Sequence, residues 1–396
     1  MRLIEDANGN NGRFLLAAGS VIEERHLRIF NIWGVSEVEV ESCGLEAGAT
    51  ASDRKFQILA EEHAERIFSH ADTTVEPFQI LKDICTKQYA AILADGGTLK
   101  TLPDCGNEIH EVPHVPIYTD VASFITSGVR LASFPDIYYK IMDAINDPST
   151  TSENLADIIS KDSGLSAKLL SLVNSPMYGF SLQVDSLSRA VSLVGRAGLS
   201  QLALSVSVME SFKGKGQSVL FMEDFWKHSL ACAVFCRILA SQIPGASQDK
   251  CFVVGILHDL GRLVLMQHHP DEVCSSFRIS MAHGLSICEA ESNIFGFDHC
   301  ELAGGLFEDW NFPSSIIDAV SGHHGSRDRN FSIESAICTV AEALAVGLQY
   351  GCDGSGLVGD LYPGAWDSLG LSGGALATTV LKAKRQIADI QIIFGV

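Results

Sequence analysis

The sequence lacks the features that mark membrane, exported and nucleic-acid-binding proteins. It has no run of roughly 18 apolar residues, the length that spans a bilayer. Its nearest approach, residues 230–239, is interrupted by Arg237 and is expected to be a core helix. Residues 1–9 have no apolar core of the kind that signal peptides carry. Lys and Arg number 28 against 48 Asp and Glu, and the net charge is -20, so we do not expect nucleic acid as a partner. Because no apolar run is long enough to span a bilayer, we do not expect a membrane either.

The chain also lacks a C-x-x-C pair, although it has 11 cysteines. Cysteine-rich zinc sites usually contain such pairs, so none is expected here. An odd number of cysteines in a chain without an export signal predicts reduced, mostly buried thiols. We therefore expect a cytoplasmic location.

The length of 396 residues allows two or three domains, and 46% hydrophobic residues allow a large core. Residues 1–48 are expected to form a small α+β module. Within it we expect a strand at 13–20, a helix at 23–33 and a half-buried strand at 35–40.

Residues 49–118 contain two helical patterns, at 53–68 and 77–93, followed by a linker rich in Gly and Pro. From residue 119 to residue 396 the pattern is almost wholly helical, and no sustained strand signal appears. The expected fold class is therefore mainly α, with an all-α domain preceded by the small α+β module.

Residues 252–262 combine an apolar run with the adjacent pair His258 and Asp259, followed by Gly261 and Arg262. Apolar residues on both sides predict a buried helix. Unpaired buried polar groups cost about 1–3 kcal/mol each, so the pair needs either a closed hydrogen-bond network or a metal ion. The residues alone leave both solutions open.

Other histidines flank this pair along the chain: His228, His299, His323 and His324. Neutral imidazole and ionised carboxylate are ordinary ligands of divalent metals, and iron, manganese, nickel and zinc all remain open. Adjacent ligands on one helix point about 100° apart, so His258 and Asp259 could share one ion or divide between two. Two ions about 3.5–4 Å apart would suit the hydrolysis of a phosphodiester.

The motifs between about residues 120 and 350 closely resemble the HDOD domain, an all-α relative of the HD phosphohydrolases. The match is carried by DSGLSAKLL and NSPMYG, and further on by FWKHSLACAVFCRILA, VVGILHDLGRLVL and AVSGHHG. Residues 15–40 resemble the short module that often precedes HD-GYP domains. HDOD domains mostly act as bacterial signalling modules, so the resemblance implies a bacterial signal-transduction protein.

HD enzymes place a first His, an adjacent His-Asp pair and a later Asp around one or two metals, and the HD-GYP branch adds further histidines. In this chain the later Asp falls near Glu342, whose side chain is one methylene longer. Carried onto this chain, the resemblance implies the metal ligands His228, His258, Asp259, His299, His323, His324 and Glu342. Arg262 keeps the cation found after the His-Asp pair in many HD enzymes. If the chain is an enzyme, Asp259 and Arg262 are the implied catalytic residues.

One departure from HD-GYP proteins bears on activity. Gly325 and Ser326 follow the His323-His324 doublet in place of a Glu, and the later Gly-Tyr-Pro is absent. We therefore expect a signalling module that contacts a protein partner, with a nucleotide or phosphate as a candidate ligand. The alternative is a metal-dependent phosphohydrolase acting on a nucleotide or cyclic dinucleotide. A third interpretation is an adaptor whose polar core holds no ion; the oligomeric state stays open.

Overall fold

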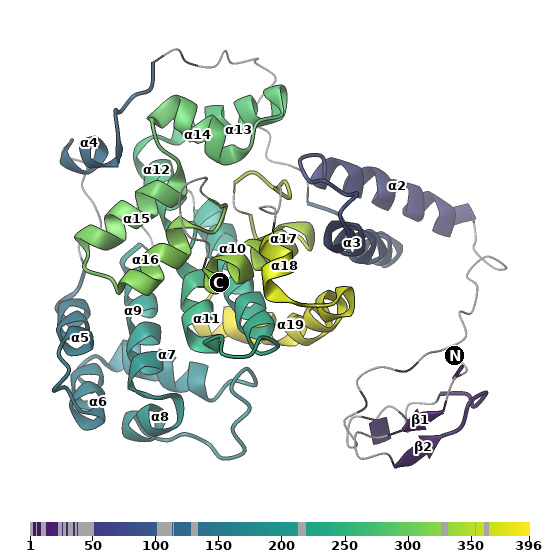
Figure 1. The fold of residues 1–396 in the computed structure, drawn as a ribbon, viewed down its shortest axis with the longest axis horizontal. Coiled ribbons are helices and arrows are strands. Elements are labelled where there is room, and N and C mark those ends of the chain that lie inside the picture. Colours follow the sequence, from purple (N-terminus) through teal and green to yellow (C-terminus); the bar gives the residue numbers. More distant parts are fainter. Residues whose placement is uncertain are drawn as a thin grey trace. The chain divides into compact units, whose positions relative to one another are not determined.

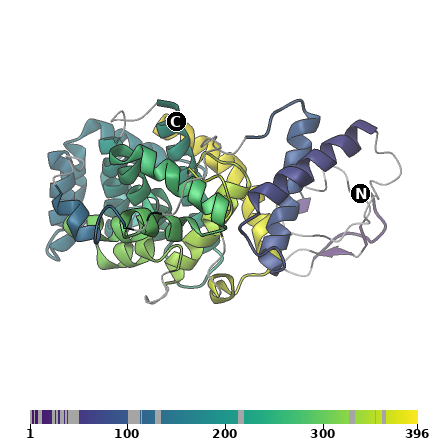
Figure 2. The ribbon, with the colours of Figure 1, turned by 90° about the horizontal axis from the view of Figure 1, so that it is seen from above.

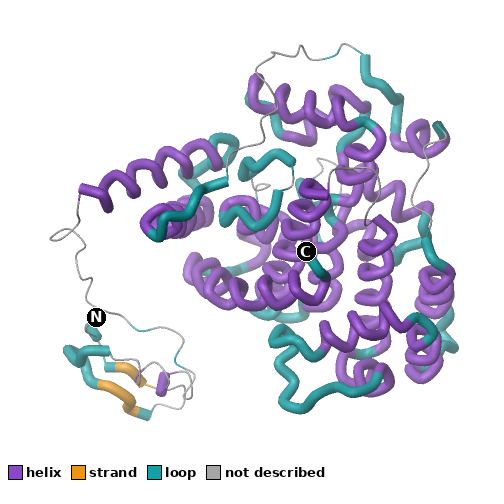
Figure 3. The backbone as a smooth tube through the Cα atoms, turned by 180° about the vertical axis from the view of Figure 1, so that it is seen from behind, coloured by secondary structure: helices purple, strands orange, loops and turns teal. Residues whose placement is uncertain are grey.

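The computed structural model divides into two compact units, residues 1–58 and residues 59–396, which are described separately. In the described part of the chain, strands occur only in the first unit, and the second is built of helices (Figures 1 and 3). The predicted mainly α class is therefore confirmed. The structure describes residues 3–4, 6–8, 13–22, 26, 29–30, 35, 38, 51–100, 113, 115–127, 134–212, 219–325, 332–352, 354–359 and 364–396.

The first unit contains a short two-stranded sheet. Strand β1 (Ala7–Asn8) pairs antiparallel with β2 (Phe14–Leu16), and Leu3 and Phe30 bury their side chains beside it. Strand β2 falls within the first strand predicted for this unit. The predicted helix is described at only three positions, all helical, and most of the second predicted strand lies outside the described residues.

The helices of the described part account for most of the chain. In order they are α2 (Ala51–Ile67), α3 (Glu76–Ala94), α4 (Val121–Thr126), α5 (Asp136–Asn146), α6 (Ser152–Ser160), α7 (Ser163–Val173), α8 (Leu187–Val194), α9 (Arg196–Phe212), α10 (Val219–Ala240), α11 (Gln248–Leu257), α12 (Leu260–His268), α13 (Pro270–His283), α14 (Ile287–Phe295), α15 (His299–Asp309), α16 (Ser314–Ser321), α17 (Ile333–Gly347), α18 (Ala365–Leu369) and α19 (Gly373–Phe394).

Helices α2 and α3 correspond to the two helical patterns predicted between residues 49 and 118. Helix α3 packs against α17 and α19 (Figure 2). The buried Tyr89 hydroxyl donates a hydrogen bond to the Gly347 carbonyl at the end of α17. Most of the predicted linker lies outside the described residues. The division at residues 48 and 118 stays a prediction.

Helices α5 to α9 form where the sequence predicts helices, and side-chain caps define several of their first turns. The side chains of Thr151, Asp162 and Ser186 each accept a hydrogen bond from a backbone N–H at the start of α6, α7 and α8. Each such cap contributes about 1 kcal/mol to helix stability. Helix α9 packs against α5, α7, α8 and α11, so it connects this group to the helices that carry the site.

Helix α10 packs against α11, α17 and α19 at the centre of the second unit (Figure 1). Residues 230–239 of this helix are buried, as predicted for a core helix. Arg237, which interrupts their apolar run, is buried too, and its guanidinium pairs with the Asp249 carboxylate. The charge is therefore accommodated by a partner on α11 rather than by solvent.

Among the described residues, no single helix is both long and apolar enough to cross a bilayer. Helices α8 and α9 reach that length and composition only when they are taken together, across a bend of 117°.

Candidate metal centre

His258 and Asp259 lie at a junction between two helices. Helix α11 ends at Leu257 with His258 as its cap, and α12 begins at Leu260 with Asp259 before it. The prediction of a buried helix through residues 252–262 is therefore wrong at the centre of that stretch. The ψ angle of Asp259 is 12°, outside the helical range, so the chain turns at this pair.

Two glycines let the surrounding helices approach closely, beside a buried cluster of polar side chains that we call the pocket. A Cβ on Gly255 would stand 2.5 Å from the Cα of Ala233, so α11 and α10 touch backbone to backbone. A Cβ on Gly261 would stand 2.0 Å from the carbonyl oxygen of His299, so α12 meets the start of α15 equally closely. Any larger residue at either position would push these helices apart.

Donors from three parts of the chain meet beside the junction. Four residues each place one ligand atom within 4.8 Å of the ligand atoms of the other three: His228, His258, Asp259 and Glu342. We call this set the four-donor site. Oδ2 of Asp259 lies 3.4 Å from Nε2 of His258 and 3.7 Å from Nε2 of His228. The first three residues are 0% exposed, and Glu342 is 7% exposed.

The orientation of His258 suits metal binding. Its Nδ1 lies 2.9 Å from the carbonyl oxygen of Gly255, so Nδ1 keeps a proton, and Nε2, once deprotonated, offers its lone pair to the four-donor site. Nε2 of His258 and Oδ1 of Asp259 are buried and make no hydrogen bond among the described residues. Atoms of this kind cost about 1–3 kcal/mol each when left unsatisfied, and a divalent cation held by two imidazoles and two carboxylates would satisfy them.

The remaining predicted ligands line the same pocket. Asp259, His299 and His323 form a second group with ligand atoms within 4.8 Å of one another, and His323, His324 and Glu342 form a third. The rings of His323 and His324 are 4.3 Å apart between centroids. The structure therefore brings together all seven side chains that the resemblance implied, and the occupancy of the pocket by metal stays a prediction.

Arg262 brings a fixed positive charge into the pocket, and its side chain is 1% exposed. Its Nη1 lies 3.3 Å from Oδ2 of Asp259, and its Nε lies 3.4 Å from Oε1 of Glu291. Its Nη2 lies 3.1 Å from Nε2 of His299. Burial alone would raise the pKa of Asp259, but Arg262 and His258 outweigh it and hold that pKa well below its usual range.

Glu291 belongs to the pocket, although the sequence reasoning did not select it. Its Oε2 accepts hydrogen bonds from the backbone N–H of His299 at 2.9 Å and from Nδ1 of the same residue at 2.5 Å. A carboxylate in this position orients the imidazole and leaves Nε2 for a ligand. Its position in the sequence could have identified it as a buried acid. It lies four residues after Ile287 and three before Ile294, on the apolar face of α14.

The histidines of the pocket differ in their preference for protons. Burial, reinforced by neighbouring positive groups, lowers the pKa of His323 and of His324 well below the ordinary value, so both keep a lone pair at neutral pH. Burial also acts to lower the pKa of His258 and His299, but neighbouring carboxylates reverse its effect and raise both values. A metal would therefore compete with protons mainly at His258 and His299.

Comparison with known proteins matches this helical unit to one family. The family model of the HDOD domain matches residues 131–326. The crystal structure of an HDOD domain protein of unknown function from Geobacter sulfurreducens is 24% identical, with a TM-score of 0.53, over 69% of this chain and 96% of that chain.

Two further crystal structures share the fold. A candidate phosphohydrolase from Shewanella amazonensis SB2B is 22% identical, with a TM-score of 0.52, over 67% of this chain and 95% of that chain. A candidate signal-transduction protein from Marinobacter aquaeolei VT8 is 19% identical, with a TM-score of 0.52, over 72% of this chain and 63% of that chain.

An uncharacterized protein from Treponema pallidum is a curated relative. It is 26% identical over 226 residues, which are 54% of this chain and 42% of that protein. The chain thus matches less than half the length of this relative.

Proposed function

Because the chain belongs to the HDOD domain family, we propose that it is a signal-transduction module that holds a divalent metal ion in the four-donor site and acts through contacts with a protein partner. The observation that carries this proposal is the burial of the pocket. His228, His258 and Asp259 are 0% exposed, so a substrate could not reach their reactive atoms without a rearrangement of the helices.

The contacts of the Arg262 guanidinium also favour a signalling module over an enzyme. A cation that binds a substrate phosphate must be available to it, whereas this guanidinium already contacts the carboxylates of Asp259 and Glu291. Its side chain is 1% exposed. The absence of the Glu and Gly-Tyr-Pro elements of HD-GYP proteins points in the same direction.

The positions of the four donors suggest how a protein partner could detect whether the four-donor site holds a metal ion. His228 comes from α10, His258 and Asp259 from the junction of α11 and α12, and Glu342 from α17. A bound divalent ion would supply a positive charge and bonds to all four side chains. Shared ligation would hold these three segments in one arrangement, and a change in that arrangement would reach the surface through the helices packed on them.

Hydrogen exchange on the full chain, with and without manganese or iron(II), tests this proposal. We expect slower exchange in α10, α12 and α17 when metal is present, and no such change in Asp259→Asn. The surface variant Asp309→Asn should behave like the wild type, because Asp309 is exposed. Metal binding without any change in exchange would contradict the proposed coupling.

A metal-dependent phosphohydrolase is the second candidate, and the donor set favours it. Two imidazoles and two carboxylates suit a metal that activates water near a phosphate. A panel of nucleotides and cyclic dinucleotides would decide between the two functions. Turnover at about 1–10³ s⁻¹, the ordinary range of enzymes, that is lost in His258→Ala and Asp259→Ala would establish the enzyme and overturn the module.

A further inference from the structure

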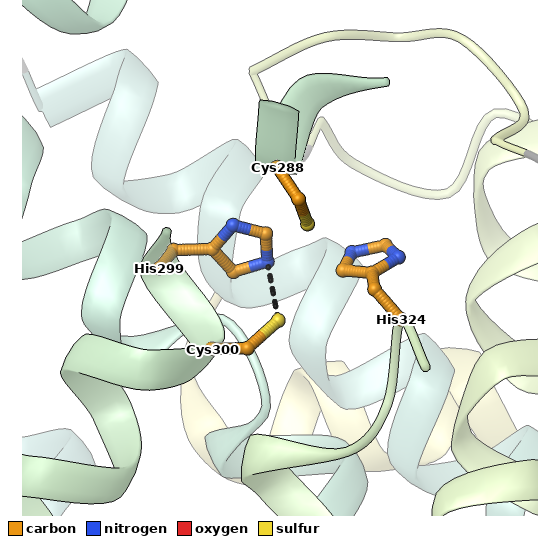
Figure 4. Close-up of side chains that lie close together, drawn as sticks. All are labelled: Cys288, His299, Cys300 and His324. Atoms are coloured by element: carbon orange, nitrogen blue, oxygen red, sulfur yellow. Dashed lines mark hydrogen bonds between the residues drawn. The ribbon is translucent and has the colours of Figure 1, made fainter. Parts of the chain in front are cut away.

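Two cysteines and two histidines converge at the start of α15. Cys288 lies on α14, His299 and Cys300 begin α15, and His324 follows α16. One ligand atom from each lies within 4.8 Å of the others. Figure 4 shows the sulfur atoms of both cysteines directed into the space between the two imidazole rings.

The spacing within this cluster suits a tetrahedral zinc ion. Sγ of Cys300 lies 3.5 Å from Nε2 of His299. With Zn–S bonds of about 2.3 Å and Zn–N bonds of about 2.0–2.1 Å, a sulfur and a nitrogen vertex of a tetrahedral site stand about 3.5 Å apart. These two ligands are therefore already at the required separation.

Both imidazoles present a nitrogen to the cluster. Glu291 accepts a hydrogen bond from Nδ1 of His299, so Nε2 of that ring is the nitrogen available to a metal. Nε2 of His324 is buried and makes no hydrogen bond among the described residues; its nearest carboxylate oxygen, Oε1 of Glu342, lies 3.4 Å away. In Figure 4 the His324 ring faces the sulfur of Cys288. Besides the convergence of the four side chains, this unsatisfied nitrogen, which is directed toward the two thiols, points to a bound ligand.

We propose that Cys288, His299, Cys300 and His324 bind one zinc ion, separate from the metal of the four-donor site. Two thiol protons would leave to solvent as two Zn–S bonds form, so the net charge of the pocket would not change. Two sulfurs and two nitrogens are the donors of structural zinc sites, and all four positions would be filled by the protein. The ion would join α14, α15 and the segment after α16.

Arg262 already contacts one of the proposed zinc ligands. Its Nη2 lies 3.1 Å from Nε2 of His299, and zinc would replace that contact. The guanidinium would keep its two carboxylate partners, Asp259 and Glu291. The buried positive charge therefore stays balanced when zinc binds.

The proposal goes beyond the metal of the four-donor site, because the two sets share no residue. Cys288 and Cys300 are 12 residues apart, without the C-x-x-C spacing that marks most cysteine zinc sites in a sequence. The two thiols come together only because α14 and α15 pack against each other.

Cobalt substitution on the full chain tests the zinc site. Co²⁺ occupies tetrahedral zinc sites, and thiolate ligands give it a sulfur-to-cobalt charge-transfer band in the near ultraviolet that nitrogen and oxygen ligands do not give. We expect this band at one cobalt per chain in the wild type, with loss of the band when zinc is added. It should be retained in His258→Ala/Asp259→Ala, which removes two residues of the four-donor site.

Cysteine variants provide the matched comparison. The band should disappear in Cys288→Ser/Cys300→Ser and persist in Cys274→Ser, since Cys274 lies on α13 outside the cluster. Zinc K-edge absorption on the loaded wild type should show two sulfur and two nitrogen ligands, a readout that does not depend on how any variant folds. Absence of the band in the wild type, its persistence in the double variant, or a Cys288–Cys300 disulfide in place of bound metal would overturn the proposal.

Discussion

Gly261 and His299 are in backbone contact: a Cβ added to Gly261 would stand 2.0 Å from the carbonyl oxygen of His299. This approach sets the position of α12 against α15, and with it the distance between the His-Asp junction and the histidine at the start of α15. The glycine of the His-Asp-x-Gly sequence therefore has a packing role in this chain, whatever the pocket binds.

Gly261→Ala should separate these two helices. Overpacking against backbone costs about 1–3 kcal/mol in free energy of unfolding, and the ligand atoms on the two sides would move apart. Urea denaturation should show the loss of stability, and metal titration should show weaker binding. Gly164→Ala is the control, because its Cβ would meet only a side-chain oxygen of Asp162, at 3.4 Å. Equal stability of the two variants would contradict the proposed contact.

Arg262→Met should leave Asp259 and Glu291 as buried carboxylates without their cation. Breaking a buried ion pair in this way costs about 3–5 kcal/mol. Because the pocket becomes more negative, a divalent metal should restore more stability to the variant than it adds to the wild type. Thermal unfolding with and without manganese measures both effects. Arg385→Met should change neither, since the Arg385 side chain is 86% exposed.

Glu291→Gln should weaken metal binding by any site that uses His299. The amide cannot hold Nδ1 of the ring as a carboxylate does, and loss of such a supporting group typically lowers metal affinity 10–100-fold. Competition with a chromogenic chelator gives the affinity. Glu308→Gln, an exposed acid on α15, should match the wild type. An unchanged affinity in Glu291→Gln would show that His299 is not a ligand.

The contribution of His63 to stability should depend on pH. Burial, reinforced by Arg66, lowers the pKa of His63 below its ordinary value of 6.5. The unfolded chain therefore binds a proton at His63 more readily than the folded chain does. Stability from this residue is present above pH 6.5 and falls as the pH drops below it. The free energy of unfolding of the wild type, relative to that of His63→Gln, should fall as the pH is lowered from 8 to about 5.5. A difference between the two proteins that does not change with pH would contradict the lowered pKa of His63.

The sequence was sufficient to predict most of the helices and, through the resemblance, seven side chains that the structure brings together. Apolar residues at helical spacing predicted the core helix α10 and helices α5 to α9. The resemblance put the final Asp of HD enzymes near Glu342, and the structure places Glu342 with His228, His258 and Asp259.

Features that depend on packing were not predictable in the same way. The apolar run through residues 252–262 continues across the break between α11 and α12, so its periodicity does not reveal the turn at Asp259. Glu291 supports a histidine eight residues further on through a hydrogen bond that forms only when α14 and α15 meet. The convergence of Cys288 and Cys300 depends on the same packing.

The occupancy of the four-donor site is best tested by elemental analysis of protein purified without chelators, before and after anaerobic reconstitution with iron(II) or manganese. We predict about one or two ions per chain in the wild type, as for related sites, and the same content in the surface variant His283→Ala. In His258→Ala/Asp259→Ala, the iron or manganese should be lost. No iron or manganese in the wild type, or equal amounts in that double variant, would contradict a metal-holding module and leave the pocket as a polar core without an ion.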